Sequence, residues 1–183
     1  MVCTFGRSVS AAAVVLLVVV TGCNDVQNPQ SPKLEAWGAP SPSGSLSGTG
    51  FIGSGTPTPG NDVQSFTFAV QSDANGVKGT FAGHDWGENA DLTTDPAADA
   101  RTFFTAFRTS SSFCSDPSRG AEFDAMGHLV EPTAMPPVDI YVAYTIKACD
   151  NGTPGTGVDQ WSADLLSRGY HKDGTVTGEI VNR

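Results

Sequence analysis

Two carboxylates and an amide lie in one short, glycine-rich loop of the sequence. Residues 150–159 read D-N-G-T-P-G-T-G-V-D, which places Asp150, Asn151 and Asp159 between two apolar segments. Hard cations such as Ca²⁺ bind six to eight oxygens from carboxylates, amides and carbonyls. The spacing is not that of an EF-hand, which needs a glutamate at the twelfth position. Asp and Asn also form structural turns by bonding to their own backbone, so a turn and a calcium site are both open interpretations.

A second group of ionisable residues lies earlier in the chain and combines five carboxylates with one histidine. Its members are His84, Asp85, Glu88, Asp91, Asp95 and Asp99. A metal site is one interpretation, and a long, solvated acidic loop over residues 86–100 is the one we favour. The two other histidines, His128 and His171, do not belong to an HExxH pattern. A zinc site made from all three histidines remains an alternative to separate surface histidines.

The sequence gives no positive support for an enzyme. It contains no G-x-S-x-G nucleophile motif, no phosphate-binding P-loop and no dinucleotide-binding glycine pattern after a strand. Paired carboxylates could hydrolyse glycosides, but the distance that decides this is not visible in a sequence. We therefore expect a protein without a cofactor, and keep a hydrolase as the alternative from another functional class.

The N-terminal residues have the pattern of a secretory signal. Arg7 precedes an apolar run at residues 11–20, and small residues follow in Val20-Thr21-Gly22-Cys23. The run is shorter than the roughly 20 apolar residues that span a bilayer. The last four residues resemble the lipobox of bacterial lipoproteins. This resemblance implies a diacylglycerol on Cys23, often with a third acyl chain on its amine. An ordinary signal peptide cut elsewhere and an uncleaved anchor are the alternatives.

The resemblance also implies a location in the bacterial cell envelope, outside the cytoplasm. Asn24, rather than Asp, follows Cys23. In the sorting pattern of enteric bacteria, Asp at this position retains a lipoprotein in the inner membrane. The outer membrane is therefore the expected location if the host has one.

Composition divides the chain into a signal peptide (residues 1–22), a lipidated linker (23–45) and a folded domain (46–183). The linker is rich in Ser, Gly, Pro and Asn, so it cannot bury enough apolar surface to fold. We expect it to be a flexible tether with a reach of about 25 Å. The net charge of −9 becomes −10 when Arg7 leaves with the signal. Such an acidic protein is not expected to bind nucleic acid or acidic substrates.

Of the four cysteines, Cys3 lies in the signal peptide and Cys23 is the proposed site of the lipid. This leaves Cys114 and Cys149 in the folded domain. An even pair in an oxidising compartment predicts a disulfide, and two free buried thiols are the alternative. The 35-residue separation corresponds to about 4 kcal/mol of stability in the chain-entropy model. Zinc is disfavoured because there is no CxxC pair.

Apolar and polar residues alternate along most of the domain, which predicts β-strands. A first strand at residues 46–52 is rich in Gly and Ser. The other predicted strands are 63–72, 77–83, 101–109, 121–130, 138–148, 161–165 and 175–181. No segment has a sustained helical period. Seven or eight strands separated by turns predict an all-β domain, a single antiparallel β-sandwich or small barrel.

The C-terminal half resembles a group of secreted bacterial β-domains of the post-COAP type. The similarity lies in D-N-G-x-P-G at 150–155, Asp159, Gly169-Tyr170 and G-T-V-T-G at 174–178. The F-x-F strand followed by Gly79-Thr80-Phe81 and His84-Asp85 is also similar. The chain departs from the pattern at residues 86–100, and at Trp161, where Phe is usual. The resemblance implies a β-fold and no particular reaction.

These observations favour a lipid-anchored envelope protein with a binding or structural module. A small-ligand or calcium-binding carrier is the alternative if the sheet closes into a barrel with an open mouth. The membrane, reached through the lipid, is the expected partner, and a protein or glycan partner would suit exposed aromatics such as Tyr141 and Tyr170. We expect a monomer.

Overall fold

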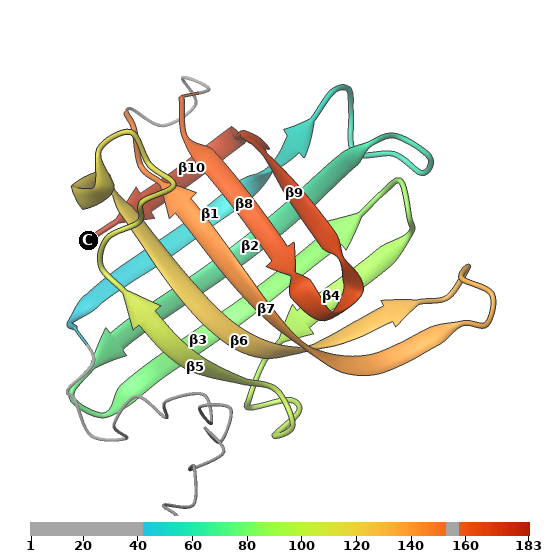
Figure 1. Cartoon of the computed structure of the whole chain (residues 1–183), viewed down its shortest axis with the longest axis horizontal. Coiled ribbons are helices and arrows are strands. Elements are labelled where there is room, and N and C mark those ends of the chain that lie inside the picture. The colour runs from blue at the N-terminus through green and yellow to red at the C-terminus, as the bar shows by residue number, and fades with distance from the viewer. Residues whose placement is uncertain (1–41, 153–157) are drawn as a thin grey trace, which may run out of the picture. The chain divides into compact units, whose positions relative to one another are not determined.

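The computed structural model describes residues 42–152 and 158–183. These residues form ten β-strands and two short 3₁₀ turns, Pro117–Arg119 and Leu166–Arg168 (Figure 1). The strands are β1 (Gly44–Gly53), β2 (Val63–Asp73), β3 (Gly76–Asp85), β4 (Ala90–Thr94), β5 (Phe103–Arg108), β6 (Gly120–Glu131), β7 (Val138–Cys149), β8 (Gln160–Leu165), β9 (Tyr170–Thr175) and β10 (Thr177–Asn182). In this part of the chain no helix is long and apolar enough to cross a membrane.

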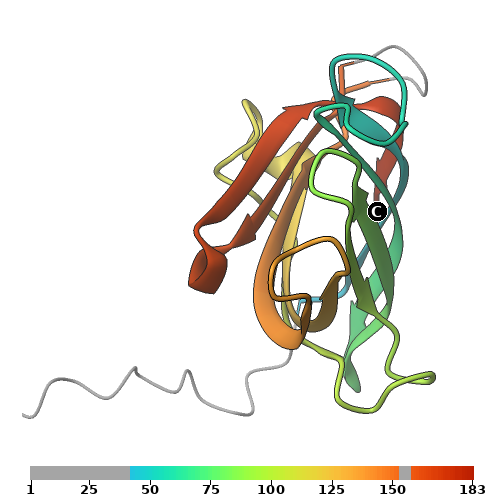
Figure 2. The same cartoon turned by 90° about the vertical axis from the view of Figure 1, so that its right-hand side faces the viewer.

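All strand pairings are antiparallel, and the strand order is β10-β1-β2-β3-β4-β6-β7-β8-β9, with β5 paired to β6. The two ends of this order, β9 and β10, are consecutive in sequence on either side of Val176. The sheet therefore curls until its ends nearly meet. In Figure 2, β1–β4 lie in one layer and β7–β9 in the facing layer. The predicted all-β fold, an antiparallel sandwich or small barrel, is confirmed.

Aromatic rings from both layers fill the interior. Alternation along β2 buries Phe66 and Phe68, as the sequence predicts, while the residues between them face outward. The Trp161 ring, which is fully buried, stacks on Phe66 with ring centres 4.0 Å apart. Trp161 also lies parallel to Phe81 at 6.0 Å. A core packed in this way argues against a ligand cavity running through the barrel.

The prediction of seven or eight strands was too low in two places. Residues 86–100 were expected to be a long loop, but they contain β4, whose Ala90, Leu92 and Thr94 point inward. Its period-two pattern is short and lies between acidic turn residues. The predicted last strand, 175–181, corresponds to β10, and β9, which precedes it at Tyr170–Thr175, was not predicted; the buried Val176 separates the two.

The predicted alternation of β5 is interrupted by a bulge. Phe103 and Phe107 were expected on one face, but Phe107 is 3 % exposed and Phe103 is 45 % exposed. The pairing with β6 shifts register between Phe104 and Ala106. A one-residue shift exchanges the two faces of a strand, which explains why the two phenylalanines differ.

Two glycines of the sheet, Gly79 and Gly178, lie where no other residue fits. Gly79 has φ of 153° and Gly178 has φ of 145°. A Cβ at Gly79 would overlap the carbonyl oxygen of Ala69, and one at Gly178 would overlap that of Thr49. Both glycines let a neighbouring strand approach closely where the sheet bends.

Candidate functional site

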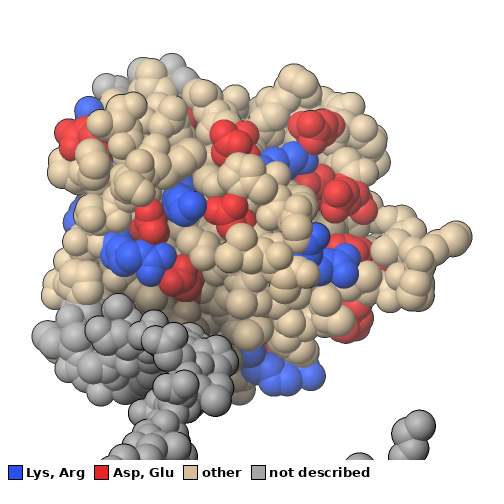
Figure 3. Space-filling model, in the orientation of Figure 1, with Lys and Arg blue, Asp and Glu red and all other residues tan. Residues whose placement is uncertain are grey.

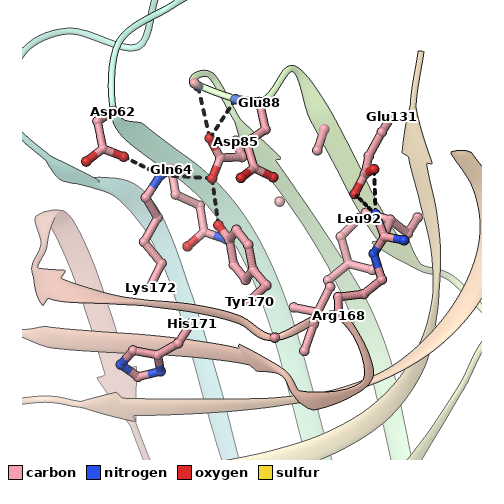
Figure 4. Close-up of a pocket in the computed structure, with 16 residues that line it drawn as sticks. Asp62, Gln64, Asp85, Glu88, Leu92, Glu131, Arg168, Tyr170, His171 and Lys172 are labelled. Atoms are coloured by element: carbon pink, nitrogen blue, oxygen red, sulfur yellow. Dashed lines mark hydrogen bonds and ion pairs between the residues drawn. The ribbon is translucent and has the colours of Figure 1, made fainter. Parts of the chain in front are cut away.

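A cleft of about 460 Å³ opens at one mouth of the barrel. Its walls come from β2, from the β3–β4 hairpin, from the end of β6, and from the segment that passes from β8 into β9. Figure 4 shows one polar cluster around Asp85 and a second formed by Glu131 and Arg168, with Leu92 beside the second. Segments far apart in sequence therefore bring their charged side chains to one place.

Asp85, the last residue of β3, is the centre of the first cluster and is 5 % exposed. One carboxylate oxygen accepts the backbone N–H groups of Gly87 (2.9 Å) and Glu88 (3.2 Å). The other accepts the Tyr170 hydroxyl at 2.7 Å and the Lys172 ammonium at 2.8 Å. Four donors therefore fix the Asp85 carboxylate in position.

These contacts decide the protonation of the cluster. Burial alone would raise the pKa of Asp85, but the hydrogen bonds from Lys172, Tyr170 and Glu88 outweigh burial and lower it. The pKa of Tyr170 is raised strongly by burial, by its bond to Asp85 and by the nearby charge of Glu88. Asp85 therefore stays ionised and Tyr170 stays neutral across the physiological range.

Lys172 joins the cluster to the rim of the cleft. Its ammonium lies 2.7 Å from Asp62, whose side chain is 86 % exposed, as well as near the buried Asp85. Burial lowers the pKa of Lys172, and the bonds to the two carboxylates reverse this and raise it. The lysine is therefore a fixed cation between one buried and one solvated carboxylate.

The opposite wall carries a second ion pair above an apolar floor. Arg168 donates to both carboxylate oxygens of Glu131, at 3.0 and 2.7 Å. The apolar part of the lining, called the floor here, includes Leu92, Leu129 and Leu165, all nearly buried. The cleft thus combines an apolar floor with polar groups fixed in position, and both features occur in small-ligand sites.

Only part of the predicted acidic group lies in this cleft. Asp85 and Glu88 line it, whereas Asp91 pairs with His84 across the β3–β4 hairpin at 2.7 Å. Asp95 accepts the backbone N–H of Ala97 in a turn. These cross-strand and turn contacts replace the long solvated loop expected here.

Asp99 and Tyr141 belong to a separate surface cluster. Asp99 pairs with Arg101 at 3.0 Å and accepts the Tyr141 hydroxyl at 2.6 Å. The pKa of Asp99 is strongly lowered by its bonds from Arg101 and Tyr141. Tyr170, the other aromatic expected on an open face, instead points its hydroxyl into the cleft toward Asp85.

The three histidines are not gathered together. Each pairs with its own aspartate: His84 with Asp91, His128 with Asp139, and His171 with Asp164 and Asp173. Figure 4 shows the His171 ring away from the Asp85 cluster. Within the described residues, no three His, Cys, Asp or Glu side chains lie close enough to hold a metal ion.

The loop that was considered for calcium is partly described, and its three candidate residues all contact the backbone. The buried Asp159 carboxylate accepts the N–H of Asn151 and that of Ile180, each at 2.9 Å. Asp150 accepts the N–H of Asn182 at 3.2 Å, and the Asn151 amide donates to the carbonyl of Val158. These contacts are those of a structural turn, but residues 153–157 lie outside the described part. Calcium binding stays a prediction, which a calorimetric titration without heat would contradict.

The predicted disulfide is confirmed, because Cys114 and Cys149 are joined at the end of β7. Cys23 lies outside the described residues, so lipid attachment remains a prediction from the sequence.

Four residues of the cleft were not singled out from the sequence: Gln64, Glu131, Arg168 and Lys172. They come from four different segments, and no local motif connects them. The one sequence feature that could have drawn attention to Arg168 and Lys172 is the scarcity of Lys and Arg, which number ten in all.

Charged side chains are mixed over the surface in Figure 3, where blue and red groups alternate. No single basic patch is visible on this face.

Comparison with known proteins does not assign the chain to a family. No family model, no curated protein and no solved structure matches it.

Proposed function

We propose that this chain is a lipid-anchored protein of the bacterial envelope whose β-domain binds a ligand in the cleft at the barrel mouth. Support for anchoring comes from the signal pattern and from the Cys that ends Val20-Thr21-Gly22-Cys23. The Cys114–Cys149 disulfide agrees with an oxidising compartment.

The observation that carries the binding function is the organisation of the cleft. Its polar side chains are held by hydrogen bonds before any ligand arrives, as the four donors on Asp85 illustrate. Groups fixed in advance lose little entropy on binding. The lowered pKa of Asp85 makes it a poor proton donor, whereas glycoside hydrolysis needs an acid with a raised pKa. Binding is thus better supported than hydrolysis.

Replacing Cys23 by serine is expected to abolish lipid attachment. The variant should no longer incorporate labelled palmitate, and its mobility should change because the thiol that carries the diacylglycerol is missing. Two or three acyl chains make membrane release very slow, so the wild type should partition into the detergent phase of Triton X-114. Labelling and partition are both measured in the host or a related bacterium.

Cys3→Ser is the matched control, since Cys3 lies within the proposed signal peptide. It should leave labelling and partition unchanged. Equal palmitate incorporation in Cys23→Ser and the wild type, or an unchanged pattern after treatment with globomycin, would contradict the lipid anchor.

A further inference from the structure

We infer that the ligand of the mouth cleft is an uncharged saccharide of one or two rings. This inference depends on the proposed binding function and adds the chemical class of the ligand. It starts from two side chains of the cleft whose hydrogen-bonding capacity is not fully used inside the described protein.

Gln64 is the first of these side chains. It is 4 % exposed and lines the cleft. Its amide oxygen accepts the indole N–H of Trp161 at 3.4 Å, but its amide nitrogen has no acceptor among residues 42–152 and 158–183. This nitrogen is not one of the buried side-chain atoms without a partner, which among the described residues are Ser72 Oγ and Ser162 Oγ. It is therefore accessible to solvent, and an acceptor oxygen of a ligand in the cleft can bind it.

Glu88 is the second. Its backbone N–H is bonded to Asp85, while its carboxylate makes no hydrogen bond or ion pair within the described part of the chain. Figure 4 shows Glu88 beside Asp85 at the cleft, and its charge is close enough to raise the pKa of Tyr170. A carboxylate accepts only, so a ligand that bonds to Glu88 must donate. A hydroxyl both donates and accepts, and neighbouring hydroxyls of a sugar can serve Gln64 and Glu88 together.

The charge of the cleft excludes anionic ligands. Asp62, Asp85 and Glu88 face the single cation Lys172 on one wall, and Glu131 is neutralised by Arg168 on the other. The walls therefore carry an excess of two negative charges. Phosphorylated or carboxylated ligands would meet repulsion, as would nucleic acid.

The floor and the size of the cleft fit a sugar ring. Leu92, Leu129 and Leu165 form an apolar surface, on which the C–H face of a pyranose can pack. The volume of about 460 Å³ lies in the lower half of the range for small-ligand sites, about 300–1,000 Å³. One or two rings, rather than a long chain, match this space.

The test is calorimetric titration of the lipid-anchored protein, purified in a detergent without a sugar headgroup. The probes are chitobiose, cellobiose and maltose, with galacturonic acid as an anionic sugar and 1,5-diaminopentane as an amine. We expect at least one disaccharide to bind, and galacturonic acid to bind more weakly or not at all. Glu88→Gln should weaken disaccharide binding about tenfold or more, because a hydrogen bond to a charged group is lost. Glu88 is exposed, so the variant should fold.

Glu179→Gln on β10 is the matched control, since Glu179 does not line the cleft; it should bind as the wild type does. Binding of no disaccharide, preference for the anionic sugar, or binding unaffected by Glu88→Gln would overturn the inference. Glu88-dependent binding of the amine alone would also overturn it while preserving a binding function. The Cys23→Ser experiment tests the lipid anchor separately. A failure of the anchoring proposal can therefore be distinguished from a failure of the saccharide inference.

Discussion

Replacing Asp85 by alanine is expected to lower the free energy of unfolding by about 3–5 kcal/mol. The substitution removes the acceptor shared by Lys172, the Tyr170 hydroxyl and two backbone N–H groups. Asp85 is 5 % exposed, so solvent cannot easily replace it. Removing Asp85 leaves Lys172 with only the solvated Asp62 and leaves the Tyr170 hydroxyl and two backbone N–H groups without their acceptor, which costs more than the intact contacts contribute. Urea denaturation at pH 7, followed by tryptophan fluorescence, measures the change.

Asp62→Asn is the matched control because Asp62 pairs with the same lysine but is 86 % exposed. Its effect should be at most about 1 kcal/mol, as for other surface ion pairs. If Asp85→Ala is no more destabilising than Asp62→Asn, the Asp85 cluster is not the structural centre of the cleft.

The Asp85 carboxylate also gives the stability a pH dependence. Its pKa is lower in the folded protein than its ordinary value of 3.8. The favourable contribution is therefore fully present above that ordinary value and is lost as the pH falls through the lower, folded value. Asp85→Asn should accordingly lose less stability than the wild type on acidification from pH 5 to pH 2. A parallel decline in the two proteins would contradict this assignment.

Removing the disulfide by a Cys114→Ala, Cys149→Ala double substitution is expected to cost about 4 kcal/mol. The bond closes a loop of 35 residues, and without it the unfolded chain gains conformational freedom. Both cysteines are nearly buried, at 4 % and 0 % exposure. A Cβ at Gly120 would overlap the sulfur of Cys114, so the bond is closely packed against the start of β6. The urea midpoint should fall by about 2 M.

The same measurement with a reducing agent supplies the control. Reduction should lower the wild-type midpoint toward that of the double variant and leave the double variant itself unchanged. If the double variant unfolds at the wild-type midpoint, the disulfide contributes nothing to stability. If reduction shifts the double variant, the effect of the reagent has another origin.

The strands were predictable wherever alternation continued for six or more residues. In β7, Val142, Tyr144 and Ile146 are buried as expected. Ile140 on the same face is 38 % exposed, although Val138, two residues earlier on this face, is partly buried against the core. β4 was missed because only Ala90, Leu92 and Thr94 carry its pattern. β9 was missed because Lys172, Asp173 and Gly174 within it are residue types typical of a turn.

The cleft could be predicted only in part. Asp85 and Glu88 were identified within an acidic stretch because the carboxylates are close in sequence. Their partner Lys172 is 87 residues away from Asp85, and only the folded sheet brings β3 and β9 together. For the same reason the sequence could not separate the cleft residues from Asp91 and Asp99, which have partners elsewhere.

Intact mass spectrometry of the protein extracted from its own membranes is the most direct test of an anchored, disulfide-closed envelope protein. The account predicts a chain that begins at Cys23 with its thiol and amine acylated, and that lacks two hydrogens for the Cys114–Cys149 bond. A mass corresponding to residues 1–183, or an unmodified Cys23 with two alkylatable thiols at positions 114 and 149, would contradict it.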